Sequence, residues 1–354
     1  MTLASPFVYF GGKRAVADVV WERFGNVSSY VEPFAGSAAV LFARPDSHRW
    51  WQQTETINDA DGMVANFFRA LQADPKAVAH YADLPVNECD MHGKHAFLVG
   101  QRAGLTAKLE GDPEYYDARI AGWWVWGLNC WIGGGWCSGE GPWHVEGGLL
   151  VRAEKPVADG QGVNLKLVHL GDDGRGVNRN RVHLGSDGQG VNRKRVNLGD
   201  DGRGHCAAIS EALEQYMMGL ADRLRRVRVC SGDWSRICGP TPLRIDSGTV
   251  GVFLDPPYAE TDGRDMGLYA VEDGTVAHDV RAWAIEWGQR RNVRIALCGY
   301  EGQPMPEGWS VHEWKASSGY AGQGQAESNG KANRRRERIW FNKSCLPITQ
   351  GRML

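Results

Sequence analysis

The sequence predicts an α/β protein built on a doubly wound, mainly parallel sheet. Short apolar strands alternate with amphipathic helices on both sides of a central insertion, which is the order that such a sheet requires. Residues 250–254 form an almost continuous apolar run, typical of a central strand buried on both faces. Small and acidic residues follow several of the predicted strands, at the edge where an open α/β sheet binds its ligands.

The predicted elements alternate along the chain. In the first part we expect strands at 29–32 and ending at 56–58, a turn at 33–37, and helices at 38–43, 63–71 and through 75–128. In the last part we expect helices at 207–226 and 277–291, and strands at 227–230, 250–254, 293–298, 309–314 and 338–342. Residues 1–74 and 206–345 are therefore predicted to build one sheet domain, with 75–205 inserted and 346–354 as a tail.

The inserted region has an unusual composition. Residues 123–143 hold six tryptophans and six glycines, and three units of 14 residues then repeat at 162–175, 176–189 and 190–203. Each unit joins an alternating apolar run to an Asp-Gly turn, which predicts short strands in a β-rich loop. The repeats are interpreted either as a tandem expansion in a tolerant loop or as a surface whose basic side chains face DNA phosphates. The repeat block holds eight basic and five acidic residues, a small excess of positive charge that favours the second interpretation only weakly.

Composition excludes several classes of protein. The 354 residues carry a formal net charge of −2, so the chain is not a simple polybasic nucleic-acid binder, although a local basic face is allowed. Apolar residues at 42% and charged residues at 23% exclude a disordered chain. No secretory signal is evident, and the most apolar stretch, 121–136, is too short and glycine-broken to cross a membrane, so a cytoplasmic protein is predicted.

No metal site is predicted. The eight cysteines form no C-x-x-C pair, and scattered thiols fit a reducing compartment. One set of residues could be considered for zinc but matches no established ligand spacing: Cys130, Cys137, His144, His205 and Cys206.

Three strand ends carry side chains suited to chemistry. At 255–258, two prolines remove backbone donors, so the Asp255 carboxylate and the Pro256 carbonyl form a pair of acceptors beside the ring of Tyr258. This arrangement suits a planar amine, and the alternative is a rigid turn with a capping aspartate. The small residues of the turn at 32–37 let the backbone approach a ligand, although the glycine in this turn can also serve packing alone. Asp59, after the next strand, is placed to hold ribose hydroxyls.

The motifs together resemble the Dam-type family of DNA adenine-N6 methyltransferases. The similar segments are Phe253–Tyr258, Val31–Ser37, the Tyr9–Lys13 motif, Ile57–Asp61 and Gly232–Trp234, in the order of that family's alpha class. The resemblance covers roughly residues 6–130 and 206–342, and it implies a Rossmann-like class I methyltransferase sheet whose insertion is a mainly helical DNA-recognition subdomain. The tryptophan-rich run and the 14-residue repeats have no counterpart in the family.

The resemblance also implies a cofactor and site residues. Residues of the matching motifs are expected to bind S-adenosyl-L-methionine: Tyr9, Phe10, Gly12, Lys13, Glu32, Pro33, Phe34, Gly36, Ser37, Asp59, Asp233, Trp234 and Asp255. The expected catalytic residues are Asp255, Pro256, Pro257 and Tyr258. Asp255 and the Pro256 carbonyl would accept the hydrogens of adenine N6, Tyr258 would stack on a base flipped out of the duplex, and transfer would be direct and in line.

DNA contacts are expected in the insertion. The candidates are Asn129, Trp131, Trp136, Arg179, Arg181, Arg193, Lys194 and Arg195, and the alternative is that most of the tryptophans form the core of a helical subdomain. The implied partner is double-stranded DNA, with a cognate restriction endonuclease as a further candidate. A bacterial or phage-encoded protein that is a monomer or weak dimer is expected.

The sequence leaves three other functions open. A cytosine-N4 methyltransferase needs the same two acceptors, and a DNA-binding module that has lost catalysis would keep the fold. A dinucleotide-dependent oxidoreductase should show G-x-G-x-x-G after its first strand, whereas Gly36 is the only glycine in 32–43.

Overall fold

The computed structural model describes residues 5–7, 13–131, 136–137, 143–146, 149–152, 206–257, 276–314 and 336–347. Several predictions lie outside these residues: those on the repeats, with Arg179, Arg181, Arg193, Lys194 and Arg195, and those on Tyr9, Phe10, Gly12 and Tyr258. Within the described ranges, no helix combines the length and the apolar character that a membrane span needs.

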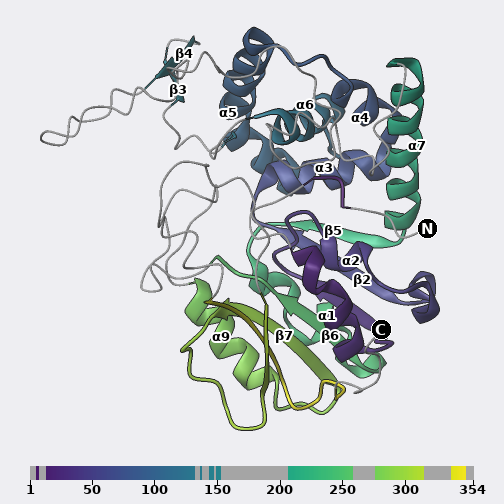
Figure 1. Cartoon of the computed structure of the whole chain (residues 1–354), viewed down its shortest axis with the longest axis vertical. Coiled ribbons are helices and arrows are strands. Elements are labelled where there is room, and N and C mark those ends of the chain that lie inside the picture. Colours follow the sequence, from purple (N-terminus) through teal and green to yellow (C-terminus); the bar gives the residue numbers. More distant parts are fainter. Residues whose placement is uncertain are drawn as a thin grey trace, which may run out of the picture.

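The centre of the protein is a seven-stranded sheet in the order β5-β2-β1-β6-β7-β9-β8, so the predicted α/β class is confirmed (Figure 1). The order runs outward from β1 in both directions. Its strands are β1 (Ser29–Glu32), β2 (Thr54–Asp59), β5 (Val227–Ser231), β6 (Val250–Leu254), β7 (Val293–Tyr300), β8 (Ser310–Glu313) and β9 (Glu337–Phe341). Strands β5, β2, β1, β6 and β7 pair in parallel, and β9 is antiparallel to both of its neighbours.

Both faces of the sheet are covered because successive side chains of its central strands point to opposite sides. Tyr30 of β1 and Phe253 of β6 pack in one buried cluster. Their neighbours Val31, Val252 and Leu254 pack in a second cluster. The apolar run at 250–254 is therefore buried on both faces, as predicted.

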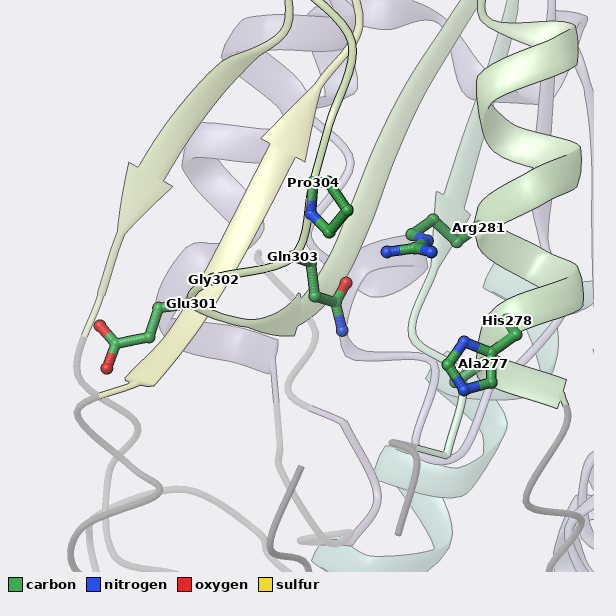
Figure 2. A pocket seen from close by; sticks show the side chains of 7 residues that line it. All are labelled: Ala277, His278, Arg281, Glu301, Gly302, Gln303 and Pro304. Carbon is green, nitrogen blue, oxygen red and sulfur yellow. The ribbon is translucent and has the colours of Figure 1, made fainter. Parts of the chain in front are cut away.

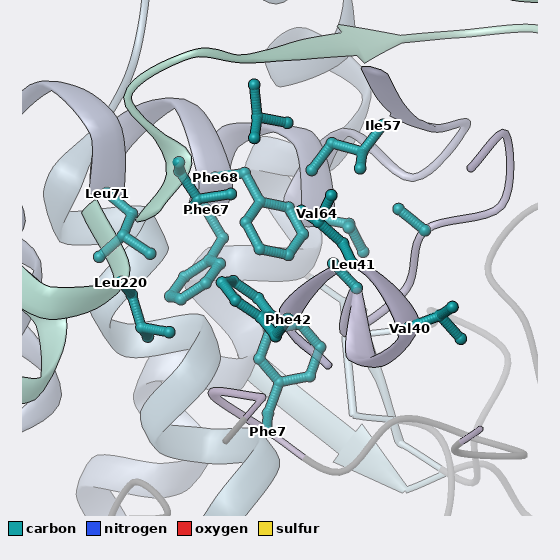
Figure 3. Packing of buried hydrophobic residues seen from close by; sticks show 14 of the residues in the cluster. Phe7, Val40, Leu41, Phe42, Ile57, Val64, Phe67, Phe68, Leu71 and Leu220 are labelled. Atoms are coloured by element: carbon teal, nitrogen blue, oxygen red, sulfur yellow. The ribbon is translucent and has the colours of Figure 1, made fainter. Parts of the chain in front are cut away.

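Helices from different parts of the chain cover the two faces. The first cluster includes residues of α1 (Ala17–Phe24), α2 (Ala39–Phe42) and α3 (Gly62–Ala73), and Figure 3 shows Leu41 and Phe42 near Phe67 and Phe68. The second cluster includes residues of α8 (Pro240–Leu243) and α9 (Val276–Trp287). Among the described residues, the short 3₁₀ helices are η1 (Lys13–Val16), η2 (Asp46–His48), η3 (Trp50–Gln52), η5 (Trp234–Ile237) and η6 (Ile245–Ser247).

Residues 75–128 are helical as predicted, but as three helices rather than one continuous stretch. These are α4 (Pro75–Ala82), α5 (Glu88–Gly111) and α6 (Ala118–Cys130). Each begins at a polar side chain that accepts from a first-turn backbone N–H, in the order Asp74, Asn87 and Asp117. They gather around α3 with α7 (Cys206–Leu224), away from α9 (Figure 1). A separate hairpin joins β3 (Trp143–Glu146) to β4 (Leu149–Arg152).

The last predicted helix is shorter than expected. Periodicity indicated residues 277–291, whereas α9 ends at Trp287. Gly288 follows in tight contact, because a Cβ there would lie 2.7 Å from the Ala284 carbonyl oxygen. The Gly288 carbonyl then accepts from the Asn342 side chain at 3.0 Å. A tertiary hydrogen bond thus takes the place of another helical turn.

Candidate active site

The site residues gather where the parallel strands end. Glu32 and Asp59 are the last residues of β1 and β2, and Asp255 directly follows β6. Because β1 pairs with both β2 and β6, these three carboxylates share one edge of the sheet. The strand order turns in opposite directions beside β1, which is where open α/β sheets form a ligand crevice.

A buried lysine holds Asp255. Lys13 Nζ lies 2.9 Å from Asp255 Oδ2 and 3.8 Å from Glu337 Oε2, and its residue is only 5% exposed. The same ammonium lies 5.6 Å from the centroid of the Trp314 ring. Cys298, at the buried end of β7, makes a side-chain hydrogen bond with Asp255. The Asp255 carboxylate, which the sequence predicts as a hydrogen-bond acceptor, is therefore held in one orientation by Lys13 of η1 and Cys298 of β7.

Glu32 is buried beside this ion pair and points back into the protein. Its Oε2 accepts a hydrogen bond from the Tyr30 hydroxyl at 2.9 Å, and it also accepts from the backbone of Leu41. Burial raises the pKa of Glu32 to about 8, with a smaller contribution from the nearby charge of Asp255. At neutral pH the carboxyl is largely protonated, so it adds little negative charge to the site.

Asp59 fixes the turn that follows β1. Its Oδ2 accepts from the Gly36 N–H and its Oδ1 from the Asp61 N–H, both at 2.9 Å. Gly36 has φ of 46°, a left-handed conformation that glycine adopts without strain. Burial, followed by the charge of Asp61, raises the pKa of Asp59 to about 7, while these backbone hydrogen bonds oppose the shift.

Asn58 ties three strand ends together. Its side-chain amide donates to the Pro33 carbonyl at 3.1 Å and to the Gly232 carbonyl at 2.9 Å. The backbone carbonyl of Asn58 accepts a hydrogen bond from the Ala35 N–H at 2.9 Å. The turns after β1 and β5 are thus hydrogen-bonded to one buried residue of β2, which keeps their spacing fixed.

Two predicted aromatic residues meet across these turns. The rings of Phe34 and Trp234 have centroids 6.2 Å apart and are inclined by 31°. Asp233 precedes Trp234 and accepts from the Ser235 N–H at 2.9 Å, so it caps the short helix η5. Pro33 and Ser37 are buried in the turn after β1. These contacts bring the motifs at 33–37 and 232–234 together although they are far apart in the sequence.

The predicted DNA-binding residues that are described lie in the helical region. Asn129 donates to the Val125 carbonyl at 2.7 Å within α6. Trp131 stacks on His95 with ring centroids 4.8 Å apart. Trp136 is 8% exposed and donates to the Trp124 carbonyl at 3.0 Å, so little of its ring is open to a base. Their contact with DNA stays a prediction, and the burial of Trp136 favours the packing alternative for that residue.

Part of the site carries no sequence motif and was not predicted. Glu337 opens β9 within a run of arginines, where its isolated negative charge gave no motif, and Cys298 is one of eight scattered cysteines. Arg102 of α5 pairs with Asp61 at 2.6 Å and also donates to the Cys137 carbonyl. Only the folded chain brings these residues beside the strand ends.

Within the described ranges, no group of three or more His, Cys, Asp or Glu side chains could hold a metal ion.

A comparison with protein families supports one of the functions considered above. Residues 9–98 match the family model of D12 class N6 adenine-specific DNA methyltransferases. The resemblance to the Dam-type adenine methyltransferase family is confirmed. No curated protein matches the chain.

The family match indicates N6-adenine DNA methyltransferase activity in general, with DNA as the substrate, and it does not favour the cytosine-N4 alternative. The matched segment runs from η1 and α1 through β1, α2, β2, α3 and α4 to the first part of α5. It therefore includes Lys13, Glu32 and Asp59, whereas Asp255 lies beyond it. The role of Asp255 rests on its own surroundings.

Proposed function

We propose that this chain transfers a methyl group from S-adenosyl-L-methionine to the N6 amine of adenine in double-stranded DNA. The observation that carries the proposal is the turn after β6, where Asp255 is held by buried Lys13 beside two prolines. The family match over residues 9–98 gives the reaction class. In this proposal the sheet is a Rossmann-like methyltransferase sheet, and α4–α6 with the residues that follow form its inserted recognition subdomain.

The proposed chemistry starts from the weak nucleophilicity of adenine N6, whose lone pair is delocalised into the ring. The Asp255 carboxylate and the Pro256 carbonyl accept the two amine hydrogens, which increases electron density on the nitrogen. Formation of the N6–methyl bond would be matched by loss of the sulfur–methyl bond, which leaves a thioether, and the proton that N6 must lose would pass by way of the Asp255 carboxylate to solvent. Pro256 and Pro257 have no backbone N–H that could compete for these acceptors. Lys13 and Cys298 hold the carboxylate in one orientation, so little reorganisation is needed when the base arrives.

The turns after β1, β2 and β5 fit the proposed cofactor. S-Adenosyl-L-methionine supplies an electrophilic methyl group when it is bound. Phe34 and Trp234 offer aromatic faces to its adenine, and Asp59 offers carboxylate lone pairs to its ribose hydroxyls. The left-handed Gly36 allows close approach of the backbone to the ligand. Lys13, Pro33, Ser37 and Asp233 are proposed to shape this site; for Glu32, the inward hydrogen bond from Tyr30 favours a supporting role.

The target adenine must leave the duplex to reach Asp255, because its N6 is otherwise engaged in base pairing. We infer that Tyr258, which follows the two prolines in the sequence, stacks on the flipped base. A cognate restriction endonuclease and a monomeric or weakly dimeric state stay predictions.

A methyl-transfer assay tests the proposed function. Purified protein, duplex DNA and radiolabelled S-adenosyl-L-methionine are incubated, and the methylated nucleosides are separated by chromatography. We expect N6-methyladenine, and we expect Asp255→Asn to lose transfer by on the order of 10²-fold or more while still binding cofactor. Asp246→Asn is the matched control, since Asp246 is exposed on η6 ahead of the same strand. Undiminished transfer by Asp255→Asn, or methylation of cytosine alone, would overturn the proposal.

A further inference from the structure

A small cavity lies beside the candidate active site, at the same edge of the sheet. Its volume is about 200 Å³, and it is bounded by the first turns of α9 and by the loop after β7. Because β7 pairs with β6 in parallel, this loop leaves the sheet next to the turn that carries Asp255. In Figure 2, Arg281 and His278 extend from α9 toward Gln303 and Pro304 across the cavity.

Arg281 supplies a positive charge that none of the residues described by the structure neutralises. Within the part of the chain that the structure describes, its half-buried guanidinium makes no ion pair or hydrogen bond. Glu301 also borders the cavity, but its carboxylate lies 2.8 Å from Arg338 and 3.6 Å from Arg336, so its charge is already compensated. The one acidic neighbour on the first turn of α9 is Asp279, which is exposed. The cavity therefore favours an anion.

The chemistry of the lining selects a phosphate group. Guanidinium groups pair with phosphate through two parallel hydrogen bonds, and this pairing fixes orientation as well as adding energy. His278 lies one turn before Arg281 on α9 and can donate a ring N–H to the same group. The amino end of α9 adds its helix dipole to these side chains, in the direction that attracts negative charge.

We propose that Arg281, assisted by His278, binds a backbone phosphate of the DNA next to the flipped target nucleotide. This inference rests on the proposed function, since it places the DNA strand over the carboxyl ends of β6 and β7. A phosphate contact at this point would set the register of the strand relative to Asp255 without reading any base. It would add a DNA contact to the sheet domain that is independent of the inserted region.

The salt dependence of DNA binding tests the site. Affinity for a fluorescent duplex is measured by anisotropy over a range of salt concentrations, for the full-length wild type and for Arg281→Ala, Arg281→Lys and Arg291→Ala. Removing one phosphate contact should weaken binding to all sequences and make the log–log salt slope shallower by about one. Arg281→Lys keeps the charge and should keep the slope. Arg291 is exposed just beyond the opposite end of α9, so Arg291→Ala is the matched control and should behave as the wild type.

A backbone scan locates the phosphate. Single neutral methylphosphonates are placed at successive positions of the duplex, and wild-type affinity should fall at one position where Arg281→Ala is insensitive. A wild-type salt slope in Arg281→Ala, with methyl transfer by the wild type intact, would overturn the phosphate site alone. If the wild type neither binds nor methylates DNA, the phosphate site and the proposed function both fail.

Discussion

At the scale of single residues, the site depends on one buried ammonium shared by two carboxylates. Lys13 Nζ is 2.9 Å from Asp255 and 3.8 Å from Glu337. With Glu337 present, the positive charge of Lys13 is shared between two carboxylates. The Asp255 carboxylate therefore stays a stronger hydrogen-bond acceptor for the amine of the substrate. Glu337 is therefore expected to act as a positioning residue, through Lys13, rather than by touching substrate.

Replacing Glu337 by glutamine tests this role. Glu337→Gln keeps the shape of the side chain but concentrates the lysine charge on Asp255, so we expect kcat for methyl transfer to fall roughly tenfold, equivalent to about 1.4 kcal/mol. The Kd for cofactor, measured by calorimetry, should change little. Glu313→Gln is the control, because that side chain on β8 is 73% exposed although it also lies near Arg338. Equal kcat values for wild type and Glu337→Gln would contradict the role.

The buried carboxyl of Glu32 predicts a pH dependence of stability. Its pKa is raised to about 8 in the folded protein, mainly by burial, from an ordinary value of 4.5. Between these values the native state binds more protons than the unfolded state, so this residue makes the free energy of unfolding fall as pH rises toward 8. Below pH 4.5 both states are protonated and the effect is absent.

Thermal unfolding of cofactor-free protein measures that effect. Between pH 6 and pH 9, we expect the wild-type Tm to fall by several degrees more than the Tm of Glu32→Gln, at about 2–4 °C per kcal/mol. Glu22→Gln on α1 is the control, since Glu22 is exposed and should leave the pH dependence unchanged. Parallel Tm curves for wild type and Glu32→Gln would show that Glu32 ionises normally.

The candidate site was predicted from the sequence only where its residues form local motifs. Lys13, Asp59 and Asp255 each stand in such a motif, and Lys13 and Asp255 meet in the fold. Glu337 was not predicted because its partner is 324 positions away along the chain, across a strand pairing that the sequence does not specify. Asn58 was seen as part of a motif, but its hydrogen bonds to the turns after two other strands depend on sheet order.

At the scale of helices and strands, the helical region depends on a close crossing of α4 and α6. A Cβ added to Gly122 of α6 would lie 2.4 Å from the Tyr81 Cβ and 2.8 Å from the Val78 carbonyl oxygen. The absence of a side chain therefore sets the distance between the two helices. The sequence predicted helices here, but it showed neither the breaks between them nor this contact.

Two glycine substitutions separate packing from helix propensity. Gly122→Ala should lower the free energy of unfolding by about 1–3 kcal/mol, because overpacking forces the helices apart. Gly104→Ala on α5 is the matched control: nothing lies within 4 Å of its added Cβ, so the better helix propensity of alanine should stabilise by about 0.5–1 kcal/mol. Urea unfolding followed by circular dichroism measures both. Stabilisation of the Gly122→Ala variant would show that the crossing is loose.

At the scale of the whole molecule, a buried charge cluster joins segments that flank the insertion. Glu55 of β2 lies 3.0 Å from Arg44 and 2.6 Å from Arg223, which comes from α7 on the far side of the insertion. All three side chains are buried, and Arg223 also lies over the Trp50 ring at 4.0 Å from its centroid. Because two arginines depend on one carboxylate, the first and last parts of the chain should fold as one cooperative unit.

Neutralising Glu55 tests that cooperativity. Glu55→Gln leaves two buried guanidinium groups without a counter-charge, so we expect a loss of about 3–5 kcal/mol in the free energy of unfolding. Glu214→Gln removes an exposed ion pair with Lys76 on the neighbouring helices, and should cost no more than about 1 kcal/mol. Tryptophan fluorescence and circular dichroism should report one coincident transition for all three proteins, and the shift of that transition should be much larger in Glu55→Gln than in Glu214→Gln. Separate transitions would mean that the helical region and the sheet unfold independently, and that the link through Arg223 does not couple them.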